Sequence, residues 1–151
     1  MDPLDILKNL PPWEPPKPAT EAQIAAFEHR IGKTLPADYR EYLRTINGGP
    51  PEPHNYCGPV INLYVQYIYS LLDDEDRISG LIYEWQVASD MPETFRDRLL
   101  PVANVGDGDR LFLSLLNGEV FYYFQDEDSF MRIDDSFSSI LKNLKCDDRN
   151  A

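Results

Sequence analysis

Carboxylates are the side chains of this sequence whose type and spacing could do chemistry. They gather in four short runs: Asp73, Asp74, Glu75 and Asp76; Asp107 and Asp109; Asp126, Glu127 and Asp128; Asp134 and Asp135. Paired carboxylates can serve as general acid and base, or can bind Ca²⁺. A calcium loop needs alternating oxygen ligands, a central Gly and a final Glu, and the run that begins at Asp107 does not continue in that way. We therefore interpret the four runs as turn residues in water.

Histidine and cysteine are too few to build a metal centre. His54 and Cys57 have a ligand-like spacing, but the sequence holds only His29 and Cys146 besides them. A zinc site normally takes three or four such ligands. A nucleophile pair of Cys57 and His54 is formally possible. No oxyanion-hole motif accompanies that pair, and the sequence has no P-loop, dinucleotide-binding or nucleophile-elbow motif. We predict a protein that is no enzyme and holds no metal or cofactor.

Two helices are predicted ahead of the acidic runs. Thr20 and Gln23 have the spacing of a capping box, which indicates a helix start, and Gly32 suits the left-handed stop of that helix. Pro36 suits the first turn of a second helix. The apolar stripe of the second helix has the i, i+3, i+4, i+7 spacing of one helical face: Tyr39, Tyr42, Leu43 and Ile46.

Strands dominate the middle of the sequence. Residues 60–72 are rich in β-branched and aromatic side chains, which predicts a strand with a bend near Gln66. Further strands are predicted over residues 101–105, 111–116, 119–124 and 130–133. Asp107-Gly108 and Asn117-Gly118 separate the first three of these. Asn-Gly between apolar runs predicts a tight hairpin in which both residues adopt positive φ.

The order of elements predicts an α+β fold. Three more helices are expected over residues 78–88, 92–98 and 136–144. Helices come first, an antiparallel set of strands follows, and a helix closes the chain. We therefore predict a single domain with an antiparallel twisted sheet of about 4–6 strands, flanked by N-terminal and C-terminal helices. Residues 1–18 form a Pro-rich N-terminal arm, residues 19–146 the domain, and residues 147–151 a C-terminal tail.

The charge of the chain restricts its partners. The 151 residues carry a formal net charge of −12, which argues against direct binding to nucleic acid or to an anionic membrane. Acidity favours a basic protein partner, although solubility alone also explains an acidic surface. No apolar run approaches the ~20 residues of a membrane span, and the N-terminus lacks the pattern of a signal peptide. We expect a cytoplasmic protein with Cys57 and Cys146 as free thiols, and a single disulfide between them stays open.

Three blocks of the sequence resemble the SUKH superfamily, which includes fungal cell-wall-assembly regulators and many bacterial immunity proteins. The first block carries Ile24, Phe27, Glu28, Ile31, Gly32, Leu35, Pro36, Asp38, Tyr39, Tyr42, Leu43, Asn47, Gly48 and Gly49. The second carries Leu99, Leu100, Pro101, Val102, Ala103, Gly108, Asp109, Leu111 and Leu113. The third carries Ile133, Asp134, Ser136, Phe137 and Leu141. The blocks follow the family's order over about residues 20 to 145, whereas the Pro-rich stretch from Pro50 to Pro59 departs from it.

The resemblance implies that the protein acts by binding another protein. One implied function is that of an immunity protein, which binds and neutralises a basic toxin domain, often a nuclease. The expected contacts are acidic, with two aromatic anchors: Asp73, Asp74, Glu75, Asp76, Asp107, Asp109, Asp126, Glu127 and Asp128, with Trp85 and Tyr123. The alternative is a regulatory or scaffold module of the cell-wall-regulator type. The sequence does not identify the toxin, and it leaves the oligomeric state open.

Overall fold

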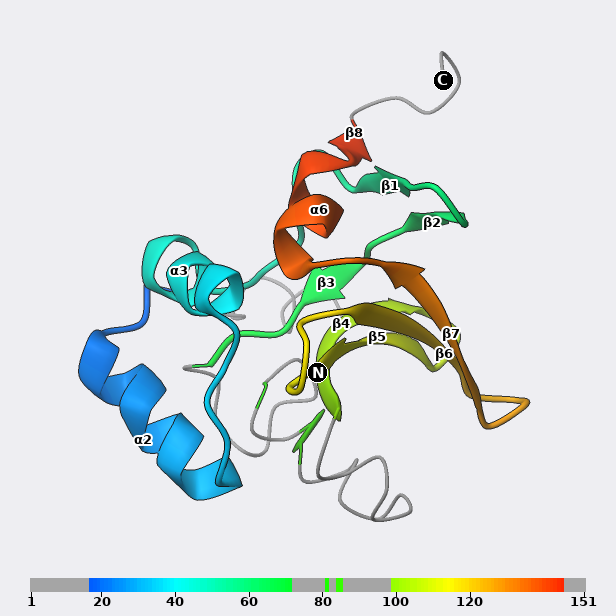
Figure 1. The fold of residues 1–151 in the computed structure, drawn as a ribbon. Coiled ribbons are helices and arrows are strands. Elements are labelled where there is room, and N and C mark those ends of the chain that lie inside the picture. The colour runs from blue at the N-terminus through cyan, green and yellow to red at the C-terminus, as the bar shows by residue number, and fades with distance from the viewer. Residues whose placement is uncertain (1–16, 72–80, 82–83, 86–98, 146–151) are drawn as a thin grey trace, which may run out of the picture.

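The computed structural model of this chain describes residues 17–71, 81, 84–85 and 99–145. Most of the N-terminal arm, the acidic run at 73–76, most of the helix expected over 78–88, the helix expected over 92–98, Cys146 and the C-terminal tail lie outside the described residues. Within the described part the chain forms three helices and two antiparallel sheets. This arrangement confirms the α+β class (Figure 1).

Both predicted N-terminal helices form, and the first of them begins and ends at its predicted capping residues. Helix α2 (Glu21–Ile31) starts at Thr20, whose hydroxyl accepts a hydrogen bond from the Gln23 N–H while the Gln23 side chain accepts one from the Thr20 N–H. The helix ends at Gly32, which adopts a φ of 73°. Helix α3 (Ala37–Thr45) follows Pro36 and buries Tyr39, Tyr42 and Leu43. The prediction is wrong for Ile46, the fourth residue of the stripe, which lies just past the end of the helix and is 54% exposed. Both helices therefore follow from local signals in the sequence.

The larger sheet is a meander with one added edge strand. Its strands are β3 (Tyr67–Ile68), β4 (Leu99–Gly106), β5 (Asp109–Ser114), β6 (Val120–Phe124) and β7 (Ser129–Asp134), and they lie in that order. All neighbours pair antiparallel. Successive turns of such a meander alternate between the two ends of the sheet. The β4–β5 turn and the β6–β7 turn therefore lie at one end, and the β5–β6 turn lies at the other (Figure 1).

The two predicted hairpin turns differ in the structure. Asp107 and Gly108 adopt φ values of 56° and 86°, so both residues of the β4–β5 turn are left-handed. At Asn117-Gly118 only Gly118 is left-handed, with a φ of 80°, and the prediction of positive φ at both residues is wrong there. The β5–β6 connection is a longer loop that runs from the end of β5 at Ser114 to the start of β6 at Val120. Within it the Ser114 hydroxyl accepts hydrogen bonds from the N–H groups of Leu116 and Asn117.

A second, smaller sheet was not expected. It consists of β2 (Asn62–Tyr64), β1 (Asn55–Cys57) and β8 (Leu144–Lys145), in that order. The strand predicted over residues 60–72 is thus divided between the two sheets, and it bends after Tyr64, close to the predicted position. The end of the helix predicted over 136–144 is strand β8, because helix α6 covers only Phe137–Lys142.

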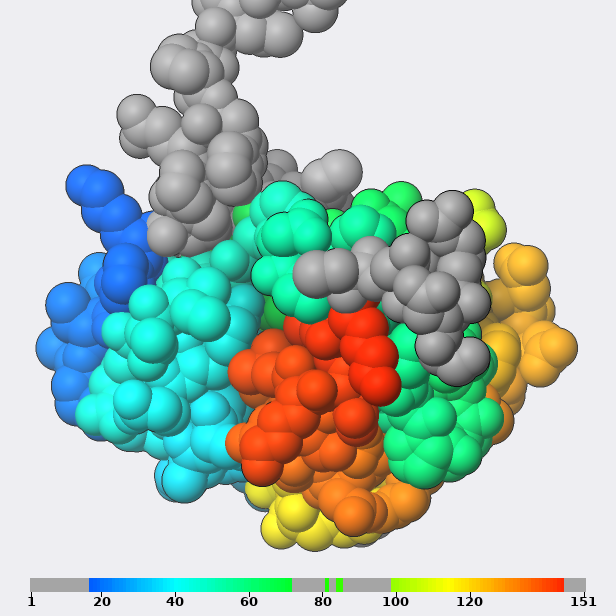
Figure 2. All heavy atoms as spheres, turned by 90° about the horizontal axis from the view of Figure 1, so that it is seen from above, coloured from blue at the N-terminus to red at the C-terminus, as the bar shows by residue number. Residues whose placement is uncertain are grey.

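One face of the larger sheet carries the main core. The helices contribute Ile24, Phe27, Tyr39, Tyr42, Leu43, Phe137 and Ile140, and the sheet contributes Leu100, Val102, Leu111, Leu113, Val120 and Ile133. Helix α6 packs against α3 through Phe137, whose ring meets those of Tyr39 and Tyr42 edge to face, with centroids 4.9 Å from each. Seen from above, α2 and α3, then α6, then the β1–β2 hairpin form one continuous surface (Figure 2).

Candidate protein-binding surface

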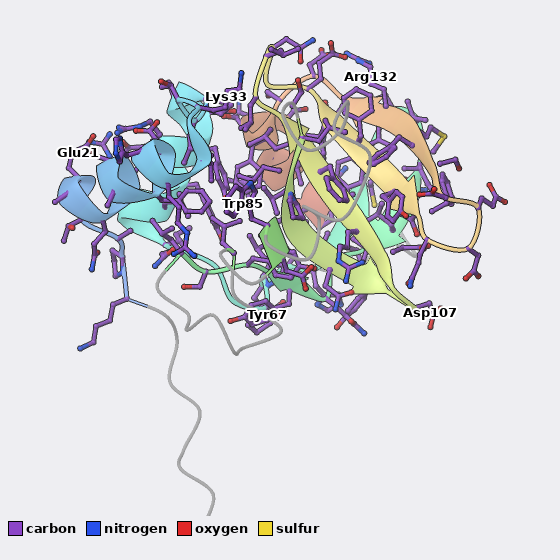
Figure 3. All side chains as sticks on the ribbon, turned by 90° about the horizontal axis from the view of Figure 1, so that it is seen from below. Glu21, Lys33, Tyr67, Trp85, Asp107 and Arg132 are labelled. Atoms are coloured by element: carbon purple, nitrogen blue, oxygen red, sulfur yellow. The ribbon has the colours of Figure 1, made fainter. Side chains whose placement is uncertain are left out.

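Five of the acidic candidates lie together at one end of the larger sheet. Asp107 and Asp109 belong to the β4–β5 turn, whereas Asp126, Glu127 and Asp128 belong to the β6–β7 turn. The two turns touch, since a Cβ atom added at Gly108 would lie 1.4 Å from Oε1 of Gln125. We call these five carboxylates the acidic end, and Figure 3 shows one of them, Asp107, at the tip of the strands.

Two neighbouring tyrosines of β6 hold the acidic end in place. The Tyr122 hydroxyl donates to Oδ2 of Asp109 at 2.6 Å, and the Tyr123 hydroxyl donates to Oδ1 of Asp128 at 2.7 Å. Asp109 also accepts a hydrogen bond from the Gln125 N–H at 3.0 Å, which ties one turn to the other. Adjacent residues of a strand point to opposite faces. Each tyrosine therefore fixes one turn from its own face of the sheet.

The other three carboxylates point into solvent. Asp107, Asp126 and Glu127 are exposed, as is Asp128, but these three accept no hydrogen bond from a tyrosine. The Ser129 hydroxyl lies at a long 3.4 Å from Glu127. In the part of the chain that the structure describes, no Lys or Arg forms an ion pair with any residue of the acidic end. Two carboxylates are thus oriented by the fold and three are available to a partner.

Tyr123 contributes by holding Asp128, since its ring is almost covered. The ring lies between Phe112 and Phe130, with centroids 5.6 and 4.8 Å away, and only 9% of the residue is exposed. Burial raises the pKa of Tyr123 to about 12, with a further contribution from the hydrogen bond to Asp128. The hydroxyl is therefore a proton donor at neutral pH, and little of the ring is left for a partner.

The structure does not bring Trp85 to the acidic end. Trp85 is half-buried and packs against the main core, and Figure 3 shows it between the helices and the sheet, well away from Asp107. The run at Asp73, Asp74, Glu75 and Asp76 lies outside the described residues.

An ion pair between buried Glu84 and half-buried Arg110, beside the acidic end, was missed by the sequence analysis. Nε of Arg110 lies 2.7 Å from Oε2 of Glu84, and Nη1 of Arg110 donates to the Gly108 carbonyl at 3.0 Å. Tyr69 forms side-chain hydrogen bonds with both charged groups. Burial raises the pKa of Glu84, and its contacts with Arg110 offset this only in part. The signal was present, because Leu81, Glu84 and Trp85 have one-face helical spacing, which places a charge on an apolar face.

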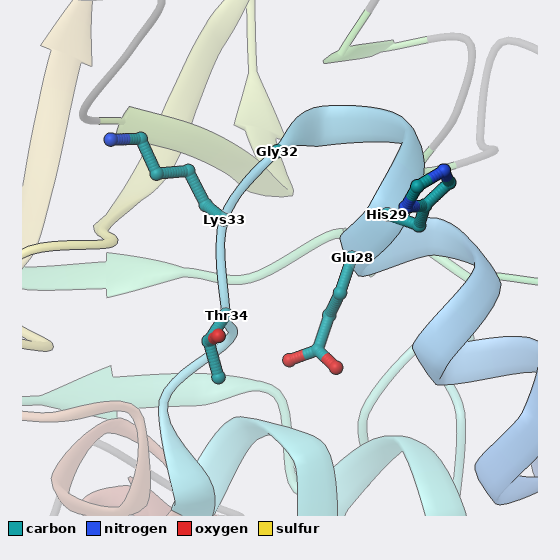
Figure 4. Close-up of a pocket in the computed structure, with 5 residues that line it drawn as sticks. All are labelled: Glu28, His29, Gly32, Lys33 and Thr34. Carbon is teal, nitrogen blue, oxygen red and sulfur yellow. The ribbon is translucent and has the colours of Figure 1, made fainter.

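An open depression at the end of α2 has its one carboxylate already engaged. It is lined by Glu28, His29, Gly32, Lys33 and Thr34, and Figure 4 shows the His29 and Lys33 side chains pointing away from each other. The Glu28 carboxylate already accepts hydrogen bonds from the Leu35 N–H at 2.7 Å and from Arg40 at 3.0 and 3.1 Å. Arg40 also pairs with Glu21 at 2.6 Å, so this network joins α2 to α3.

The described residues also bear on two other kinds of site. No group of three or more His, Cys, Asp or Glu side chains there could hold a metal ion. Within the same residues no helix is long and apolar enough to cross a membrane. Cys57 is a free thiol.

The SMI1 / KNR4 family (SUKH-1) matches residues 18–143. This chain belongs to the SUKH-1 family. The match confirms the resemblance and covers all three blocks of the sequence that carried it. A comparison with curated proteins gives no match. In this SUKH-1 domain the Asn47-Gly48-Gly49 block has a structural role, because Asn47 is fully buried and joins three chain segments.

Proposed function

We propose that this SUKH-1 protein is an immunity protein, which binds a cognate toxin domain in the cytoplasm and blocks its activity. Membership of SUKH-1 supports a role in protein–protein interaction. The observation that carries the proposal is the acidic end, where five carboxylates from two touching turns meet without a basic partner among the described residues.

The proposed mechanism is a steric and electrostatic block. A nuclease cleft is basic because it binds phosphates, and three exposed carboxylates on a fixed frame present a similar pattern of negative charge. Tyr122 and Tyr123 hold Asp109 and Asp128 before a partner arrives, so little ordering remains to be done on binding. Complementary charge also speeds encounter, with association rates up to ~10⁸–10⁹ M⁻¹s⁻¹ at low salt.

Two other predicted contacts remain part of this proposal. The run at Asp73, Asp74, Glu75 and Asp76 would add a second acidic segment, and Trp85 would be an aromatic anchor outside the acidic end. Charge reversal of the 73–76 run distinguishes the contribution of this run to toxin binding from that of the acidic end. If that change leaves binding and its salt dependence unaltered, the acidic end is the main contact and the 73–76 run is not.

The test uses the toxin domain of a large secreted protein encoded beside this gene. The triple variant Asp107→Asn, Asp126→Asn and Glu127→Gln removes the charge of the three exposed carboxylates that no tyrosine holds, with little change of side-chain shape. Calorimetry should give a Kd on the order of nM or below for the unmodified chain, with loss of toxin activity at one equivalent. The triple variant should bind at least about a hundredfold more weakly, since several steering charges are removed together.

A matched control separates the acidic end from net charge. The triple variant Glu41→Gln, Glu52→Gln and Asp135→Asn removes the same charge from exposed positions outside the acidic end. It should bind within about threefold of the unmodified chain, because distant exposed charges are screened. Equal losses in the two triple variants would contradict the assigned surface. Absence of binding to the toxin would contradict the immunity function and favour the regulatory or scaffold module, which an unbiased pull-down would then examine.

A further inference from the structure

Strand β2 presents a sheet edge that pairs with no other strand of the described residues. We propose that two copies of this chain associate there, with the β2 strands antiparallel and a two-fold axis passing near Leu63. This inference does not depend on the proposed function.

The register shows which backbone groups of β2 face outward. Strand β2 is the outer strand of the order β2-β1-β8. The Val65 N–H donates to the His54 carbonyl at 2.8 Å, and the Gly58 N–H donates to the Ile61 carbonyl at 3.2 Å. Backbone groups alternate sides along an antiparallel strand. Residues 61, 63 and 65 therefore face β1, and the N–H and C=O groups of Asn62 and Tyr64 face away from it.

Nothing in the described part of the chain pairs with this edge. Among the described residues, the outward N–H and C=O groups of Asn62 and Tyr64 form no backbone hydrogen bond to another strand. Both side chains are exposed, Tyr64 by 52%, and Val60 in the adjoining turn is exposed by 53%. Figure 2 shows the β1–β2 hairpin (green) on the outside of the molecule.

Charge and backbone pairing distinguish β2 from the other edges. Proteins commonly protect an exposed edge with charged side chains. Edge strand β7 carries Arg132, which pairs with Glu119 and Asp135, and edge strand β8 carries Lys145. Between Pro50 and Leu71 the sequence has a single charged residue, Glu52. Edge strand β3 is uncharged as well, but the N–H and C=O groups of its Ile68 bond to Gly49 at 3.0 and 2.8 Å. Among the edges that the structure describes, that of β2 therefore has neither a charged side chain nor a backbone partner.

A second copy fits this edge better than a basic partner does. Each chain carries a net charge of −12, so two copies repel wherever charged surfaces meet. A neutral edge removes that obstacle and offers nothing for a basic protein to recognise. An antiparallel pair centred on Leu63 is self-complementary, as a two-fold interface requires. It places Asn62 opposite Tyr64 of the second copy and forms about four backbone hydrogen bonds.

Sedimentation velocity of the full chain from about 10 µM to 1 mM tests the proposal. A short edge makes a small interface, so we expect a dimer with a Kd on the order of 10–100 µM. Raising the salt to about 0.5 M should strengthen the dimer, because it screens the repulsion between like charges. Toxin binding should weaken under the same change, so the two associations can be told apart.

Two variants of β2 locate the interface. Asn62→Asp adds a charge at the edge with little change of size and should weaken the dimer at least tenfold. Tyr64→Pro removes an outward N–H and leaves the bonds to β1 intact, which an edge strand tolerates, and it should also abolish the dimer. The control Gln23→Glu adds the same charge on α2, where a Glu can still complete the capping box, and its dimer should keep its Kd within about twofold.

Three results would overturn the proposal. They are a monomer at about 1 mM, a dimer that neither β2 variant weakens, and a dimer that Gln23→Glu weakens as much as Asn62→Asp does. Far-UV circular dichroism and a thermal melt of each variant show that a lost dimer is not a lost fold.

Discussion

At the residue scale, two buried tyrosines of this domain differ in what their hydroxyls do. The Tyr39 hydroxyl is buried and has no hydrogen-bond partner among the described residues. The Tyr56 hydroxyl donates to Oδ2 of the buried Asp134 carboxylate at 2.8 Å. A buried polar group without a partner costs free energy, whereas a hydrogen bond to a charged group stabilises the fold.

We expect the same substitution to act oppositely at the two tyrosines. Tyr39→Phe should leave the free energy of unfolding unchanged or raise it by about 1 kcal/mol, since it removes an unpaired hydroxyl. Tyr56→Phe should lower it by about 1.5–3 kcal/mol, because Asp134 loses a donor. Urea unfolding of both variants measures the difference. A Tyr39→Phe variant that is less stable than Tyr56→Phe would show that Tyr39 has a polar partner.

Asn47 also stabilises the fold, because its side-chain amide links segments that are distant in the sequence. Its Nδ2 donates to the Lys17 carbonyl at 2.7 Å, and its Oδ1 accepts from the Leu71 N–H at 2.9 Å. The residue is fully buried and adopts a φ of 64°. Asn tolerates this left-handed conformation better than most residues.

Substitutions at Asn47 should separate the stability contributed by its two hydrogen bonds from the strain of its left-handed backbone. Asn47→Gly removes the strain of the positive φ but loses both side-chain hydrogen bonds. It should therefore lower the free energy of unfolding by about 2 kcal/mol. Asn47→Ala adds conformational strain and should cost about 1 kcal/mol more. The exposed amide of Asn62 is the control, since Asn62→Ala should stay within about 0.5 kcal/mol. Equal stability of the Gly and Ala variants in chemical unfolding would contradict the assigned strain.

At the element scale, Asp134 joins β7, α6 and β1. Besides Tyr56, its carboxylate accepts hydrogen bonds from the Asp135 N–H, at 2.7 Å, and from the side chains of Ser139 and Asn143. Burial alone would raise the pKa of Asp134, but these hydrogen bonds outweigh burial and hold the pKa below its ordinary value. The ionised carboxylate is therefore the form that the fold prefers.

This preference predicts the sign of a pH effect. A lowered native pKa adds stability above the unfolded value of about 4, and that stability is lost as the pH falls through the native pKa. Asp134→Asn should therefore lower the free energy of unfolding at pH 7 and flatten its decline below about pH 4. Asp135→Asn, at the exposed neighbouring residue, should keep the decline. A decline that is unchanged in Asp134→Asn would contradict the role of this carboxylate.

The elements differ in how far the sequence predicts them. Helices α2 and α3 are predictable because Thr20, Gln23, Gly32 and Pro36 act within their own turns. Strands β1 and β8 have three and two residues, too few for a pattern, and they exist only because distant segments pair. The bend after Tyr64 is signalled in the sequence, but the change of sheet at that bend depends on what each half of the segment pairs with.

At the scale of the whole molecule, topology decides which charges act together. The acidic runs are visible in the sequence, but only the β4–β7 meander places the turn at Asp107 beside the turn at Asp126. The roles of Tyr122 and Tyr123 likewise depend on register, since each must reach a turn beyond its own strand. The position of Glu84 on an apolar helical face indicates that it needs a partner, but the sequence does not identify that partner as Arg110.

The association rate with the toxin domain, measured by stopped flow across salt concentrations, tests the central claim most directly. The acidic end is predicted to steer encounter, so the rate should fall by at least about tenfold between about 20 and 500 mM salt. The variant without Asp107, Asp126 and Glu127 carboxylates should start lower and show a much flatter dependence, whereas the control triple variant should follow the unmodified chain. Parallel salt dependences in all three proteins would contradict the claim that this end of the sheet meets the toxin.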